Sequence, residues 1–153
     1  MPSDPVFLQA QKAIADAIEA NYTSGYSGLD LSATGTIVRG AMPEAPMVPS
    51  GCVVMIDCLE TQGKTLGYYS GTINYEIYGF IGGGNVSDRN DNAIRLGADF
   101  INAITADRSL GLSTTDDVLC SFAALDGDQY GLGSSCGIAY VRVEVSFSNS
   151  SGV

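Results

Sequence analysis

The chain contains no histidine, and only seven lysine and arginine residues stand against seventeen aspartates and glutamates. Without imidazole, a Ser-His-Asp triad, a histidine general base and a histidine-ligated zinc are excluded. The net charge of −10 argues against duplex DNA or anionic lipid as a tightly bound partner, because both need clustered basic residues. These absences make an enzyme less expected than a structural or binding protein.

Long hydrophobic runs are also missing. No stretch approaches the roughly 20 apolar residues of a membrane helix, and the first five residues lack the basic start and apolar run of a signal peptide. We therefore expect a protein made in the cytoplasm that contacts no membrane. With 153 residues, 45% of them hydrophobic, the chain is predicted to form one domain with its own core.

The four cysteines match no CxxC spacing, so neither a zinc site nor a redox motif is expected, and no cofactor is predicted. Cys52 and Cys58 lie on one predicted strand, roughly 20 Å apart at about 3.3 Å per residue, and cannot bridge each other. Cys120 and Cys136 flank a turn-rich segment almost symmetrically and could face each other across a hairpin. The simpler interpretation is that all four are small, buried, reduced side chains.

Hydrophobic periodicity predicts two helices and five strands. The helices are expected over residues 5–21, where Asp4 and Pro5 resemble a helix start, and over residues 87–106, where Ser87 and Asp88 resemble a cap. The strands are expected over residues 34–42, 51–59, 72–81, 118–125 and 136–147. A polar loop is expected over residues 60–70, and a flexible tail over residues 146–153.

Short turns between these elements favour antiparallel pairing. We therefore predict an α+β domain in the order α-β-β-β-α-β-β, spanning residues 1–153. Its two helices are expected to pack on one face of a mostly antiparallel β-sheet.

Three short motifs fit local structure better than they fit chemistry. Residues 133–137 match G-x-S-x-G, but a strand instead of a helix follows and no histidine exists to activate the serine. Gly63-Lys64-Thr65 lacks the opening glycine and the following helix of a P-loop. The stretch that begins at Asp126 has tyrosine and glycine where a calcium loop needs ligands, so we expect a turn there.

The predicted strands carry more apolar side chains than one layer of helices can cover. The second face of the strand 51–59 offers Val53, Met55 and Leu59. The less apolar faces of two other strands offer a further four, which are Tyr78, Phe80, Ile138 and Tyr140. Such residues are typical of contacts between chains, although a second layer made from the chain's own loops is an alternative. We favour oligomerisation and predict subunit contacts at these last four residues.

Several stretches match a known class of protein. They include Val38-Arg39-Gly40 ahead of a proline-rich link, the apolar strand 52–59, and the strand that ends over residues 75–80. The next helix carries Arg89, Ala93 and Leu96, and the last strand alternates valine. The most specific stretch follows that helix, at residues 103–112, and reads Asp107-Arg108-Ser109-Leu110-Gly111 near its end. In these features the chain resembles the tail terminator proteins of long-tailed bacteriophages, with the related neck and tail-completion proteins.

The resemblance covers nearly the whole chain, and the sequence departs from it at Leu112 and in the loop 61–71. It implies a non-enzymatic virion protein of the tail or neck, assembled in the host cytoplasm. Such a protein forms a ring, a hexamer, that caps the tail tube, stops its polymerisation and joins it to the head. The implied partners are further copies of the chain, the tail tube protein and a head-completion or connector protein.

DNA would pass through such a ring without specific binding, because an acidic wall repels it. The loops implied to face the tube or the lumen are residues 60–70 and 82–88. Their candidate residues are Glu60, Lys64, Asn85 and Asp88.

Three alternatives stay open at this point. The first is a head-completion or neck adaptor protein, which differs mainly in its partner. The second is a small magnesium-dependent enzyme that uses Asp116, Asp126 and Asp128. The third is a monomeric binding module with a self-contained core, which its mass in solution would reveal.

Overall fold

The computed structural model describes residues 3–20, 26–27, 37–40, 50–65, 68–130 and 136–150. Within these ranges the two helices are α1 (Val6–Ala20) and α2 (Val86–Thr105), and a short 3-10 helix, η1, covers Gly127–Tyr130. The strands are β1 (Ile37–Arg39), β2 (Ser50–Thr65), β3 (Tyr68–Gly82), β4 (Thr115–Asp126) and β5 (Cys136–Asn149). The predicted order α-β-β-β-α-β-β is confirmed.

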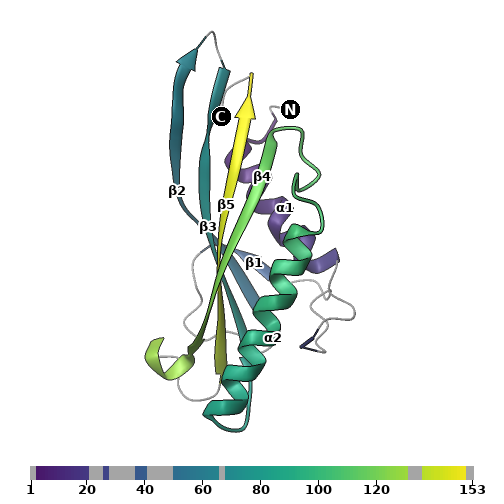
Figure 1. Ribbon diagram of the computed structural model, residues 1–153, viewed down its shortest axis with the longest axis vertical. Helices are drawn as coiled ribbons and strands as arrows, with labels where there is room; N and C mark the ends of the chain where they lie inside the picture. Colours follow the sequence, from purple (N-terminus) through teal and green to yellow (C-terminus); the bar gives the residue numbers. More distant parts are fainter. Residues whose placement is uncertain are drawn as a thin grey trace.

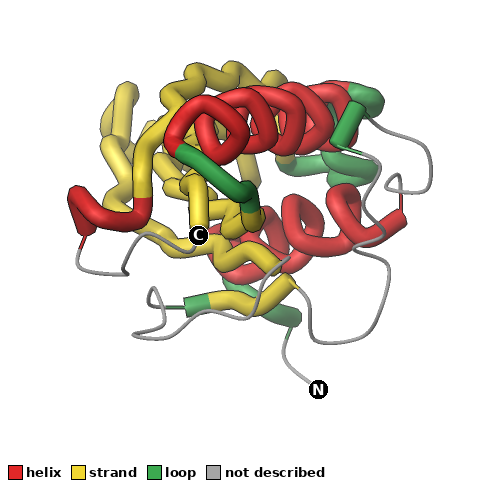
Figure 2. Tube along the Cα trace, turned by 90° about the horizontal axis from the view of Figure 1, so that it is seen from below, coloured by secondary structure: helices red, strands yellow, loops and turns green. Residues whose placement is uncertain are grey.

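The five strands form one sheet in the order β1-β2-β3-β5-β4. Only the short β1 runs parallel to its neighbour β2, and every other pair is antiparallel. Figure 1 shows the long strands crossing the molecule. In Figure 2, α1 and α2 lie next to each other on one side of the strands. The predicted α+β class, with helices on one face of a mostly antiparallel sheet, is confirmed. No helix among the described residues is long and apolar enough to cross a bilayer.

The main core lies between the helices and the sheet. Alternate residues of β3 and β5 face the helices, and those of β5 run from Ala139 to Phe147, every one of them apolar and buried. α2 contributes a stripe at helical spacing, which consists of Ala93, Leu96, Phe100 and Ile104. Each large aliphatic or aromatic side chain buried in this way contributes roughly 1.5–3 kcal/mol.

Glycines let α2 lie close to the sheet. A Cβ at Gly97 would lie 2.0 Å from the Phe122 ring of β4. A Cβ at Gly79 of β3 would lie 2.4 Å from the Phe100 ring. Any larger residue at either position would push the helix away from the strands.

Both ends of α2 are fixed by local hydrogen bonds. The Asn85 side chain accepts a hydrogen bond from the Asp88 backbone N–H at 2.9 Å, so the cap lies two residues before the predicted one. After Thr105 the chain turns, and the Asp107 carboxylate accepts from both the N–H and the hydroxyl of Ser109. Leu110 and Gly111 then take left-handed backbone angles, with φ of 53° and 69°, which directs the chain into β4.

Two segments predicted to be loop or tail are strands. β2 continues to Thr65 and β3 begins at Tyr68, and the two pair here, with Glu60 opposite Gly71 and Thr65 opposite Tyr68. Residues 66–67 of the predicted loop lie outside the described residues. β5 continues to Asn149, so the predicted flexible tail does not begin at residue 146. Both extensions pair backbone groups that would otherwise stay open, and Phe147 is buried edge-to-face against Phe7 of α1.

None of the four cysteines forms a disulfide. The possible approach of Cys120 to Cys136 across a hairpin is contradicted, because the β4–β5 register places Cys120 opposite Val143, seven residues along β5 from Cys136. Seven residues of strand span roughly 23 Å, well beyond the reach of a disulfide. Burial raises the pKa of the Cys52 and Cys120 thiols to about 11, which keeps both protonated and unreactive.

Candidate functional site

The face of the sheet opposite the helices carries the four residues predicted to form subunit contacts. Tyr78 of β3 lies opposite Tyr140 of β5, and Phe80 lies opposite Ile138. The register therefore brings the four together in two adjacent rows. We call this surface the open face.

Two of these four residues are not available at the surface. Phe80 and Ile138 are both 0% exposed and form a second, smaller cluster with Cys52 and Cys136. Their assignment to an exposed face is wrong, because Val54, Tyr78 and Leu125 pack against this cluster and help to bury it. Val53 is likewise buried, and it belongs to the main core on the helix side.

Tyr78 and Tyr140 remain half-buried on the open face and are held by one carboxylate. The Tyr78 hydroxyl donates to Glu76 Oε2 at 2.6 Å, and the Tyr140 hydroxyl donates to Glu76 Oε1 at 2.8 Å. The two rings lie 5.4 Å apart at their centroids, tilted by 54°. Burial, and then the Glu76 carboxylate, raise the pKa of Tyr78 well above its usual value, so this phenol stays a hydrogen-bond donor.

A shallow hollow of about 370 Å³ adjoins the two tyrosines, and Ala123 and Leu125 of β4 complete its lining. None of its lining side chains is a nucleophile or a general base at neutral pH. The geometry suits contact with another molecule better than chemistry on a substrate.

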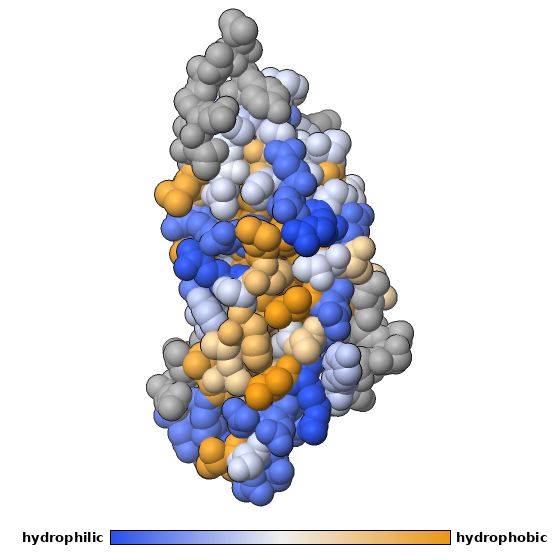
Figure 3. All heavy atoms as spheres, viewed as in Figure 1, coloured by the Kyte–Doolittle hydropathy of each residue, from blue (hydrophilic) through white to orange (hydrophobic). Residues whose placement is uncertain are grey.

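β4 forms one edge of the sheet, since it pairs only with β5 among the described strands. Its residues 118–125 read VLCSFAAL and include no charged residue, glycine or proline. Leu119 there is 55% exposed. Figure 3 shows apolar atoms crossing the middle of the molecule over β4, with hydrophilic atoms around them. This edge was not predicted from the sequence, although an uncharged run in an acidic chain is a visible signal.

β2 forms a second open edge over part of its length. Its parallel ladder with β1 ends at Val53, whose carbonyl accepts from the Gly40 N–H at 2.9 Å and from Gln11 Nε2 at 3.0 Å. Beyond that point β2 pairs only with β3 among the described strands. Three large apolar side chains are exposed here, which are Met55, Ile56 and Leu59. Ile56 falls in a register shift, so it has no cross-strand partner.

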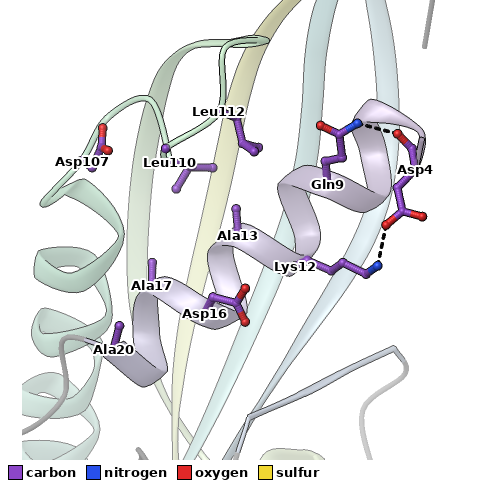
Figure 4. A pocket seen from close by; sticks show the side chains of 11 residues that line it. Asp4, Gln9, Lys12, Ala13, Asp16, Ala17, Ala20, Asp107, Leu110 and Leu112 are labelled. Atoms are coloured by element: carbon purple, nitrogen blue, oxygen red, sulfur yellow. Dashed lines mark hydrogen bonds and ion pairs between the residues drawn. The ribbon is translucent and has the colours of Figure 1, made fainter. Parts of the chain in front are cut away.

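A groove of about 500 Å³ lies between α1 and the turn that follows α2. Leu110 and Leu112 line it from the turn, and the small residues of α1 line the other side, which are Ala13, Ala17 and Ala20 (Figure 4). An ion pair between Lys12 and Asp4 stands at its rim. The groove was not predicted from sequence, although its turn carries the stretch that suggested a family resemblance.

The residues predicted to face a tube or lumen do not meet in one place. Glu60 and Lys64 lie in β2 instead of in a loop, near its hairpin end, whereas Asn85 and Asp88 begin α2. β3 separates the two groups, so they lie at opposite ends of the molecule, at the top and bottom of Figure 1. They therefore form two separate groups, and their contact with a tube or a lumen stays a prediction.

The three acids of the possible magnesium site do not meet in one place. Asp116 lies ten residues before Asp126 along β4, roughly 33 Å away in an extended strand. Asp126 is already engaged by Arg89, with Arg89 Nε 3.0 Å from one carboxylate oxygen. The described residues hold no group of three potential metal ligands. The geometry therefore contradicts the magnesium-dependent alternative in this form.

Comparison with known proteins finds a similar fold among solved structures. No family model matches the sequence, and no curated protein matches it. Among solved structures, a chain of the "virion of native gene transfer agent (GTA) particle" superposes with a TM-score of 0.61. The superposition covers 95% of this chain and 100% of that chain at 10% sequence identity. The likeness at this identity establishes a shared fold.

Proposed function

We propose that this protein is a structural component of a phage-like virion and acts without catalysis. The observation that carries the proposal is the fold shared, over the full length of the other chain, with a chain of a gene transfer agent virion. The resemblance of its sequence to tail terminator proteins points in the same direction. The tyrosine-lined open face and the two apolar strand edges support a role in assembly.

Within the virion, we assign the protein to the tail or neck as a tail terminator. Copies of the chain form a ring, a hexamer, on the last disc of the tail tube, stop its growth and offer a surface to the head-completion or connector protein. DNA passes through without specific binding, in keeping with the net charge of −10. The half-buried Tyr78 and Tyr140 are the remaining candidates for subunit contacts on the open face.

Deletion of the gene from the element that encodes the virion tests this role. A tail terminator is expected to leave tubes of uncontrolled length and heads without attached tails, visible by electron microscopy of the lysate. Tails of normal length that fail only to join heads would instead indicate a neck adaptor. Intact, joined particles would contradict the proposal.

Solution mass tests the ring independently. A hexamer of the 15.9-kDa chain has a mass of about 95 kDa, six times that of the monomer. Because ring formation can require the tube as a template, the mass is measured with and without purified tail tubes. Binding to portal rings in place of tail tubes would favour the neck adaptor.

A further inference from the structure

The sheet has two open edges on opposite sides. On one side it ends at β4, and on the other, beyond Val53, it ends at β2 among the described strands (Figure 1). An open edge presents a row of unpaired backbone N–H and C=O groups that another strand can join.

β4 lacks the features that normally prevent such joining. Soluble proteins protect an edge with charges, proline, bulges or a very short strand. β4 is twelve residues long, its one register shift lies at its start, and its residues 118–125 are uncharged. A long uncharged edge in a protein of this acidity is an aggregation hazard unless a defined partner covers it.

The exposed apolar side chains of the two edges lie at the same level of the sheet. Leu119 of β4 lies opposite Glu144 of β5, and Glu144 lies opposite Asn74 of β3. Asn74 in turn lies opposite Asp57 of β2, between the exposed Ile56 and Leu59. Leu119 at one edge therefore lies in the same rows as the apolar part of the other edge.

Strand direction makes the two edges compatible. The three antiparallel pairings mean that β2 and β5 run one way, and β3 and β4 run the other. When a second copy is rotated about an axis along the strands, its β2 meets the first copy's β4 in antiparallel orientation. The contact uses different surfaces on the two copies, so it repeats from copy to copy and can close into a ring.

We propose that the outer edge of β4 in one copy pairs with the outer edge of β2, beyond Val53, in the next copy. The pairing extends the sheet from subunit to subunit and covers Leu119 against the Ile56–Leu59 region. This inference rests on the ring of the proposed function and identifies the occupant of both edges as a second copy of this chain.

Two edge-blocked variants test the pairing in the full chain. Leu119→Lys blocks β4, and the double variant Ile56→Lys/Leu59→Lys blocks β2, since a charge on an edge strand opposes pairing. Ile94→Lys, at a 45% exposed position on α2, is the control for an added charge at an apolar surface site. Circular dichroism and the unfolding midpoint establish that each variant folds.

Sedimentation velocity measures association of each variant alone and of equimolar mixtures. Each blocked variant alone is expected to associate at least roughly tenfold more weakly than the wild type, whereas the control is unchanged. The mixture of the two blocked variants is expected to form a one-to-one pair and nothing larger. That pair arises because one variant retains an intact β2 edge and the other retains an intact β4 edge.

A blocked variant that associates as strongly as the wild type would overturn the edge pairing. A mixture of the two blocked variants that forms no pair would overturn it too. Self-association of the β2-blocked variant would indicate contact between two β4 edges and would also overturn it. A wild-type chain that stays monomeric with and without tail tubes overturns it as well. The gene deletion judges the proposed function separately, since tails of uncontrolled length support that role whichever surfaces the copies use.

Discussion

At the scale of single residues, the contact between α2 and the sheet depends on the absence of a side chain at Gly97. We expect Gly97→Ala to lower the free energy of unfolding by about 1–3 kcal/mol, because the added methyl group overlaps the Phe122 ring. Urea denaturation measures the change. Gly84→Ala is the matched control, since its Cβ would meet only Asp88 Oδ2, at 3.4 Å, and should alter stability by less than about 0.5 kcal/mol. Equal stability of the two variants would contradict the packing described for α2.

The ion pair between Arg89 and Asp126 makes the free energy of unfolding depend on pH in the acidic range. The hydrogen bond from Arg89 lowers the pKa of the Asp126 carboxyl below its usual value of about 3.9. The unfolded chain therefore binds the proton more readily, and the contribution of the pair, complete above that usual value, is lost as pH falls through the lower folded-state pKa.

We expect Asp126→Asn to be less stable than the wild type at neutral pH and to lose less stability between about pH 5 and about pH 3. Urea midpoints measured across this range test the expectation. Arg89→Gln removes the same pair and should flatten the dependence in the same way. If both variants lose stability between about pH 5 and about pH 3 as steeply as the wild type, other carboxylates, such as Asp117 beside Arg108, account for the acid sensitivity.

At the scale of elements, the turn between α2 and β4 depends on a left-handed backbone at Gly111. A side chain at a φ of 69° is strained even though open space surrounds the position. We expect Gly111→Ala to cost about 1 kcal/mol of unfolding free energy and Gly111→Asn to cost less, because asparagine tolerates this conformation. Thermal or urea unfolding measures the difference. Stabilities that rank alanine above asparagine would contradict the explanation.

The sequence predicts the helices better than the ends of the strands. α1 and α2 each begin and end within two residues of the expected bounds, because their apolar stripes and flanking turn residues are local signals. Residues 60–65 are mostly polar and are typical of a loop by sequence, yet cross-strand pairing with β3 makes them strand. The length of a strand depends on pairing with a segment that is distant in sequence. Hydrophobic periodicity along one segment carries no information about that partner.

At the scale of the whole molecule, net charge opposes the association of copies. Each chain carries a charge of −10, so neighbouring copies in a ring repel one another. We expect association of the wild type to strengthen as salt rises from about 0.05 M to about 0.5 M, because the Debye length falls to a few ångströms. Sedimentation velocity at the two salt concentrations measures the effect. Dissociation at high salt would show that ion pairs, and not apolar edges, hold the copies together.

The candidate surfaces were only partly predictable. The alternation of β3 and β5 places Tyr78, Phe80, Ile138 and Tyr140 on one face, as expected. Which of them a neighbouring molecule could reach depends on packing between strands, and that packing buries Phe80 and Ile138. The open edge at Leu119 follows from the strand order, in which β5 lies between β3 and β4.

The sequence by itself determined the class of fold, the helices, the buried faces of β3 and β5 toward the helices and the absence of imidazole chemistry. These follow from composition and from periodicity along the chain, which are local properties. The tertiary structure alone decided the lengths of the strands, the separation of Cys120 from Cys136, and the two strands left at the edges. Each of these depends on which distant segments pair and in which register, and that is fixed only when the whole sheet closes over its core.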